Sequence, residues 1–98
     1  MLKRQKIAGT KIVKLSFVLP GDDPRLPAAV VGDFNDWDEA ADPLRRRSNG
    51  TASAVVSLDA GRASRFRYRS ASGAWFNDDA ADAYEPNAHG STDCIVVA

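Results

Sequence analysis

The stretch RFRYRS, residues 65–70, decides the fold class, because apolar and charged side chains alternate along it with a period of two. Successive side chains of a β-strand point to opposite faces of its sheet. Phe66 and Tyr68 are therefore expected to face a core, and the three arginines beside them to face the other way. The stretch predicts a β-strand with one buried face.

Similar patterns recur on both sides of this stretch, bounded by clusters of Gly, Pro, Asn, Asp and Ser that favour turns. The other expected strands are Thr10–Leu19, Ala28–Gly32, a short edge strand Pro43–Arg47, Thr51–Leu58 and Thr92–Ala98. Trp75 and Phe76 precede a long polar loop, Asn77–Ser91. No stretch shows the apolar period of a helix. About seven short strands separated by turns predict an all-β protein built as a β-sandwich.

A chain of 98 residues and 10.5 kDa has the length of one domain. Its formal net charge is zero, with 13 Lys and Arg against 13 Asp and Glu, but the charges are unevenly distributed. Residues 1–14 carry five cations and no anion, whereas residues 15–50 and 51–98 are each net acidic. Because residues 1–10 are also the least apolar, we expect them to be a basic flexible lead-in to a single module over residues 11–98.

The composition argues against several classes of protein. A nucleic-acid binder usually carries a basic excess, which this chain lacks. No apolar stretch is long enough to span a bilayer, and the basic start lacks the apolar segment of a secretory signal. The single cysteine, Cys94, excludes an internal disulfide and a cysteine zinc site, and it is expected to be buried. We therefore expect a cytoplasmic protein that binds neither nucleic acid nor membrane.

The sequence offers no catalytic or metal site. The only histidine, His89, lies in a loop, and no serine has the flanking glycines of a nucleophile elbow. Asp78 and Asp79 are adjacent carboxylates in an expected surface turn, where two acids seldom share a catalytic site. The acidic residues of Asn77–Ser91 do not match the spacing of a calcium-binding loop. We expect neither an enzyme nor a cofactor nor a bound metal ion.

Two tryptophans lie where an expected strand meets a polar turn rather than within an alternating apolar face. A tryptophan in a small sandwich often fills the core. Asp36 and Asp38 flank Trp37, however, and Gly73-Ala74 precedes Trp75, which indicates contact with solvent. An exposed indole can stack against the apolar C–H face of a sugar while nearby polar groups bond the sugar hydroxyls. A sugar-binding surface is therefore one candidate function for the two tryptophans, and a place in the core is the alternative.

Several short motifs occur together in one order: Gly32–Trp37 (GDFNDW), Pro43-Leu44, Gly61, Phe66–Tyr68, Gly73–Asp78 (GAWFND), and Gly90 before a final apolar strand. This pattern, from about Val13 to Val97, resembles the early-set, immunoglobulin-like domain at the N-terminus of isoamylases and glycogen branching enzymes. It is equally similar to the glycogen-binding domain of AMP-activated protein kinase β subunits. Together these are the family-48 carbohydrate-binding modules. The resemblance implies an immunoglobulin-like sandwich that binds α-glucan.

The resemblance also implies roles for the first motif. Gly32, Phe34 and Asn35 would form its structural part, with Phe34 turned inward to cap the sandwich. Asn35 would bond backbone groups within its own tight turn. Trp37 would then be directed outward, and with Trp75 it would form the two-tryptophan platform on which an α-glucan stacks.

Two further positions are implied to bind carbohydrate beside the tryptophans. Arg67 matches the basic residue that bonds sugar hydroxyls in the kinase-type members of the family. Asp93 stands where those members have an asparagine, and a carboxylate only accepts hydrogen bonds, so one donor is lost. No hydrophobic residue in Asn87–Gly90 matches the one that enters the glucan ring in some members.

The expected function is non-catalytic binding of α-1,4-glucan (glycogen, a starch-like polymer or a maltooligosaccharide), which would localise or regulate a separate partner such as an enzyme of glycogen metabolism. The alternative is a protein-interaction module on the same scaffold with weak or no sugar binding. Both tryptophans favour the first function. Asp93 and the arginines of Arg45–Arg47 and Arg65–Arg69 favour the second, although such arginines are often paired with acidic side chains across strands.

Overall fold

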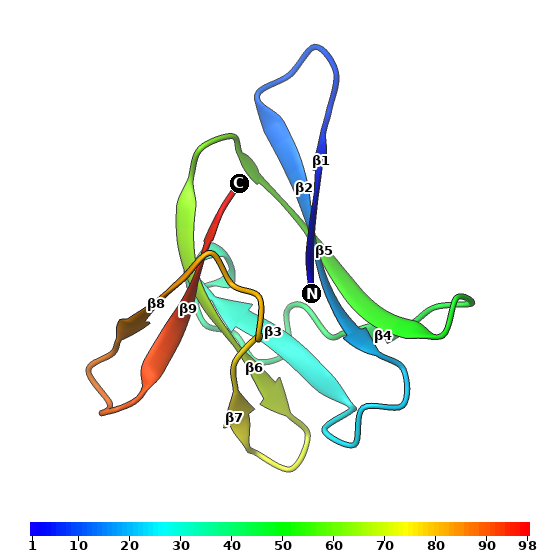
Figure 1. The fold of residues 1–98 in the computed structure, drawn as a ribbon, viewed down its shortest axis with the longest axis vertical. Helices are drawn as coiled ribbons and strands as arrows, with labels where there is room; N and C mark the ends of the chain where they lie inside the picture. Colours follow the sequence, from blue (N-terminus) through cyan, green and yellow to red (C-terminus); the bar gives the residue numbers. More distant parts are fainter.

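The computed structural model describes all 98 residues as two antiparallel β-sheets, and confirms the expected all-β sandwich (Figure 1). The strands are β1 (Leu2–Lys6), β2 (Ile12–Pro20), β3 (Ala28–Gly32), β4 (Arg45–Arg46), β5 (Thr51–Asp59), β6 (Ala63–Ser70), β7 (Trp75–Phe76), β8 (Ala83–Pro86) and β9 (Thr92–Val97). The four-stranded sheet has the order β1-β2-β5-β4. The five-stranded sheet has the order β3-β6-β9-β8, with β7 paired to β6. A single 3-10 turn, η1 (Asp33–Asn35), follows β3.

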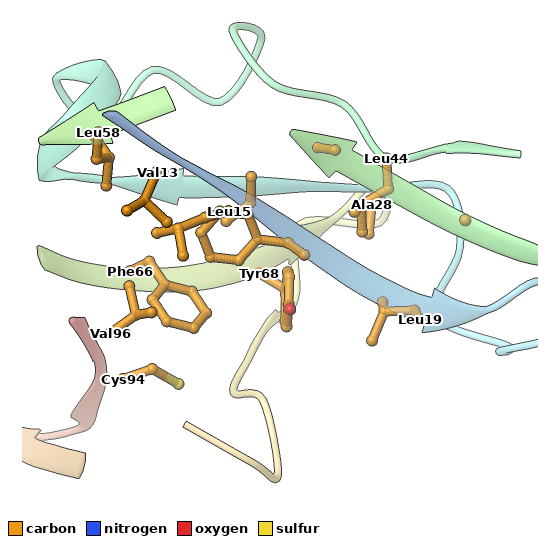
Figure 2. Packing of buried hydrophobic residues seen from close by; sticks show 14 residues of the cluster. Val13, Leu15, Leu19, Ala28, Leu44, Leu58, Phe66, Tyr68, Cys94 and Val96 are labelled. Atoms are coloured by element: carbon orange, nitrogen blue, oxygen red, sulfur yellow. The ribbon is translucent and has the colours of Figure 1, made fainter. Parts of the chain in front are cut away.

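The core lies between the two sheets and is built by the alternation that the sequence shows. On β6, Phe66 and Tyr68 are fully buried, while Arg65, Arg67 and Arg69, which alternate with them, remain half-exposed. Phe17 of β2 packs edge-on against Phe66, with ring centroids 4.9 Å apart. Figure 2 shows apolar side chains from both sheets filling the space between them. This packing removes one face of each sheet from water, which is the main stabilising contribution to a small sandwich.

The expected strands are found within about two residues of their predicted ends, and β3 has the predicted bounds. Two segments differ from expectation. The polar loop Asn77–Ser91 contains β8, all of whose side chains are exposed, and Trp75-Phe76 is itself the short strand β7. The structure therefore has nine strands rather than about seven.

The first ten residues are not the flexible lead-in that their composition predicts. Leu2–Lys6 form β1, which pairs antiparallel with β2. Lys6 lies opposite Val13 at one end of the ladder, and Leu2 lies opposite Phe17 at the other. Backbone hydrogen bonds hold an edge strand whatever its side chains are, so a polar sequence does not prevent pairing. Leu2 also packs against the core, and Arg4 bonds the carbonyl oxygen of Val97 at 2.8 Å and the carboxylate of Asp82.

The four-stranded sheet carries most of the unpaired positive charge of the protein. Of the 13 Lys and Arg residues, five arginines form ion pairs with carboxylates. Of the remaining eight, Arg67 lies on β6. The other seven lie on β1, β2, β4 or the adjoining turns; they are Lys3, Lys6, Lys11, Lys14, Arg45, Arg46 and Arg47. Among the carboxylates only Asp59 belongs to a strand of that sheet. The four-stranded sheet is thus cationic.

Two further features of the fold concern membrane-spanning helices and metal-binding clusters. Its one helical segment is the short η1 turn, and no helix could cross a bilayer. No group of three or more His, Cys, Asp or Glu side chains is arranged to hold a metal ion.

Candidate functional site

An open cavity of about 780 Å³ lies on the outer face of the five-stranded sheet. It brings together the four residues singled out from the sequence: Trp37, Arg67, Trp75 and Asp93. The other lining residues are Glu39, Arg65, Pro86, Asn87, Ala88 and His89. We call this site the indole cavity. Its walls come from the loop after η1, from β6, β7 and β9, and from the β8–β9 hairpin.

The turn after β3 is held by Asn35, as the motif predicts. Its side-chain oxygen accepts a 3.0 Å hydrogen bond from the N–H of Gly32, and its amide group donates to the carbonyl oxygen of Val30 at 3.1 Å and to Asp42 at 2.8 Å. Gly32 is required by close packing: a Cβ there would overlap the carbonyl oxygen of Arg65 and approach the Phe34 ring to 2.8 Å. This turn fixes the direction in which the chain leaves β3.

Phe34 and Trp37 leave the turn on opposite sides. The ring of Phe34 is half-buried and stacks on Phe17 with centroids 5.6 Å apart, so it packs inward. Asp36 and Trp37 both adopt the left-handed conformation, with φ of 56° and 57°. Such backbone is disfavoured for residues other than glycine and is often found at functional sites. The backbone N–H of Trp37 donates to the carbonyl oxygen of Gly32 at 2.9 Å, and the residue is 40% exposed.

Trp75 is placed by the pairing of β7 with β6, opposite Arg69. The residue is 39% exposed, and the guanidinium carbon of Arg69 lies 4.8 Å from the centroid of its indole, within the range of a cation–π contact. Arg67 lies farther away, at 6.0 Å. Both tryptophans are therefore surface residues rather than core residues, which settles the alternative that the sequence left open.

Arg67 has donors free for a ligand. Its Nε donates to the side-chain oxygen of Asn77 at 2.7 Å, and the amide group of Asn77 donates to the carbonyl oxygen of Thr92 at 2.9 Å. No carboxylate lies within ion-pairing distance of this guanidinium, although it is half-buried. The remaining N–H groups of Arg67 can thus donate to hydroxyl groups in the indole cavity.

Asp93 is buried, and its carboxylate is already bonded within the protein. One oxygen accepts from the Asn87 amide at 2.9 Å, and the other lies 3.3 Å from Arg65. Arg65 also pairs with Glu85 at 2.5 Å. The structure thus gives Asp93 a part in anchoring the β8–β9 hairpin, with a limited capacity to accept a further hydrogen bond.

Sequence reasoning missed several lining residues. Glu39 lies two positions beyond Trp37, and its contact with Arg69 depends on how the loop folds back over β6. Asn87 and His89 reach the cavity only because the unexpected strand β8 turns them towards β9. Arg65 was recognisable, because it shares the outward face of β6 with Arg67.

The most deeply buried carboxylate lies outside the indole cavity. Asp78, expected in a surface turn, is only 3% exposed, because its carboxylate is drawn to three donors. It accepts hydrogen bonds from the Tyr68 hydroxyl at 2.7 Å, the Ala80 N–H at 2.8 Å and the Met1 ammonium group at 3.0 Å. Burial favours the neutral acid, but these donors outweigh it and hold the pKa of Asp78 below its usual value.

Cys94 lies in the core, as expected. Burial raises the pKa of its thiol to about 11, so the reactive thiolate is suppressed at neutral pH. The N–H of Asp78 donates to its sulfur at 3.3 Å. The thiol therefore has a packing role rather than a chemical one.

No protein-family model matches this chain, and no curated protein sequence is similar to it.

Proposed function

We propose that the protein binds α-1,4-glucan through the indole cavity without acting on it chemically. The observation that carries the proposal is that two exposed indoles line one open cavity together with an arginine whose donors are largely free. An exposed indole face is costly to leave in water and matches the C–H face of a pyranose.

The polar side chains of the cavity suit a sugar rather than an apolar ligand. Arg67 supplies N–H donors, and the polar side chains of Asn87 and His89 also line the cavity beside the indoles. Two stacking contacts and a few solvent-exposed hydrogen bonds support a modest affinity, with a Kd of roughly 10 µM to 1 mM. Binding of this strength is useful where many sites act on one polymer.

The resemblance to family-48 carbohydrate-binding modules supports the same ligand class. The resemblance implies that Trp37 of GDFNDW and Trp75 of GAWFND form the two-tryptophan platform, and both residues line the indole cavity. Two departures from that family, Asp93 in place of asparagine and the small polar segment Asn87–Gly90, would weaken binding without removing the stacking surface.

The carboxylates of the cavity support binding rather than hydrolysis. Glycoside hydrolysis uses one carboxylic acid as proton donor and a second carboxylate as nucleophile or base. Glu39 and Asp93 line the cavity, but the carboxylate of each is engaged in an ion pair with an arginine, Glu39 with Arg69 and Asp93 with Arg65.

A titration followed by backbone amide NMR tests this function. Maltoheptaose is expected to shift amides near Trp37, Arg67 and Trp75, whereas cellohexaose is expected to leave them unchanged, since its flat chain does not follow a surface suited to a curved glucan. Trp37→Ala and Trp75→Ala should each abolish the shifts. Equal shifts with cellohexaose would contradict selectivity for α-glucan, and shifts with neither sugar would favour the protein-interaction module instead.

A further inference from the structure

An ion pair joins the two segments that carry the tryptophans. Glu39 lies in the loop that follows Trp37, and its carboxylate contacts the guanidinium group of Arg69 on β6. Arg69 in turn stands beside Trp75, at 4.8 Å from the indole centroid and opposite it in the β6–β7 pairing. Carboxylate, guanidinium and indole therefore form one continuous set of contacts.

Arg69 supports Trp75 from outside the indole cavity. It lines a second, smaller cavity of about 350 Å³ that also includes Gly73 of the β6–β7 turn, whereas Trp75 lines only the indole cavity. Glu39 lines both. The ion pair thus stands at the boundary between the two cavities.

We infer that Glu39 and Arg69 are positioning residues that hold the Trp75 indole in fixed relation to the Trp37 loop, and so set the arrangement of the two stacking surfaces. This inference rests on the proposed function for its biological meaning but not for its structural test. A sugar that stacks on both indoles needs their relative placement fixed before it binds, because ordering side chains on binding lowers affinity.

The pair is exposed, which limits the size of its effect. The side chain of Arg69 is 31% exposed and that of Glu39 is 51% exposed. Exposed pairs contribute little to stability and are weakened by salt. Loss of the pair is therefore expected to weaken maltoheptaose binding by about 2- to 5-fold while leaving the protein folded.

The structural test uses Trp37→Phe as its reference, because Trp75 is then the only tryptophan. In that background, Glu39→Ala and Arg69→Leu are expected to shift the Trp75 emission to longer wavelength and to increase its quenching by acrylamide. Arg69→Lys, which keeps a cation beside both partners, should remain close to the reference. Addition of 1 M NaCl should reproduce the Glu39→Ala effect in the reference and add nothing in the Glu39→Ala variant.

Arg62→Ala is the matched control. It removes the Arg62–Asp33 ion pair, whose side chains are 43% and 40% exposed, and neither residue lines either cavity. Its fluorescence and sugar binding should equal those of the parent protein.

The outcomes separate the inference from the proposed function. Unchanged Trp75 emission and quenching in both Glu39→Ala and Arg69→Leu would overturn the positioning role, whatever the sugar does. Changed fluorescence with rescue by Arg69→Lys supports it, even if the parent protein fails to bind maltoheptaose, a result that would count against the proposed function alone.

Discussion

The hydroxyl group of Tyr68 donates a 2.7 Å hydrogen bond to the carboxylate of Asp78. Tyr68 is fully buried on β6, and Asp78 is the second residue of the polar segment that leads from β7 to β8. The bond therefore joins the centre of the core to the segment that connects β7 to β8. Burial, and then the neighbouring carboxylate, raise the pKa of Tyr68 far above its usual value, so the hydroxyl keeps its proton and remains a donor.

This bond makes the stability of the protein sensitive to acid. The pKa of Asp78 is lower in the folded state than in the unfolded chain, since its three hydrogen-bond donors outweigh burial. Its contribution is therefore fully present above about pH 4 and is lost as the pH falls through the folded value. Urea unfolding at pH 6 and pH 3 should show a larger loss of stability for the parent than for Asp78→Asn.

Asp79→Asn is the control for that comparison, because Asp79 is an exposed neighbour. At pH 7, Asp78→Asn should lower the free energy of unfolding by about 1–3 kcal/mol, the usual cost of disturbing a buried hydrogen-bonded group. If the parent and Asp78→Asn lose the same stability between pH 6 and pH 3, the Asp78 carboxylate is not the source of the acid sensitivity.

Trp37→Ala and Trp75→Ala should separate binding from stability. Both indoles are exposed, so their truncation opens no cavity in the core. Each change is expected to cost within about 1 kcal/mol of stability while abolishing maltoheptaose binding. Urea unfolding and the sugar titration on the same samples provide the measurement. A Trp75→Ala protein that binds the sugar normally would remove Trp75 from the site.

Phe34→Ala should have the opposite effect. Its ring packs on Phe17 and closes one end of the core. Full burial of a phenylalanine makes truncation cost about 3–5 kcal/mol, and half-burial reduces that to about 2–3 kcal/mol. The loss is severe for a domain of this size. A stability equal to that of Trp37→Ala would show that Phe34 contributes no more to the core than its exposed neighbour.

Cys94 should be unreactive in the folded protein. Burial raises the pKa of its thiol to about 11, above the value near 9 expected for an unfolded thiol. The folded state therefore binds the extra proton, and stability from this group should decline as the pH rises from about 9 to 11. At pH 8 an aromatic disulfide reagent should modify the protein only in urea. Rapid modification of the native protein would show that the last strand opens readily.

The success of sequence reasoning depended on how each strand is held. The bounds of β3 were predictable because Ala28–Gly32 is an apolar run that is buried throughout, ending at Gly32. Strand β1 was missed because only Leu2 of its five residues packs against the core. Its other side chains are exposed, so they show no apolar alternation, and backbone hydrogen bonds to β2 hold the strand in place. Strand β8 has four exposed side chains and shows no alternation at all.

Part of the candidate site was likewise predictable from local sequence, and part of it was not. Trp37 and Trp75 were found because short local motifs place them beside turns. The contacts of Glu39 with Arg69, and of Arg65 with Asp93, join residues about 30 positions apart in the sequence. Such pairs are set by the register of β6 against β9 and by the path of a loop, neither of which a local pattern contains.

The seven unpaired cations on the four-stranded sheet and its adjoining turns leave the charge of this chain unevenly distributed despite its zero net charge. Near pH 7 a negatively charged sulfonate resin is expected to bind the four-stranded sheet, whose strands carry only one carboxylate, Asp59. A positively charged quaternary amine resin is expected to bind the acidic loops instead. The protein is therefore expected to adhere to both resins at low ionic strength and to leave both at moderate salt. It would lie on each with a different face outward, and on the sulfonate resin the indole cavity would point to the solution.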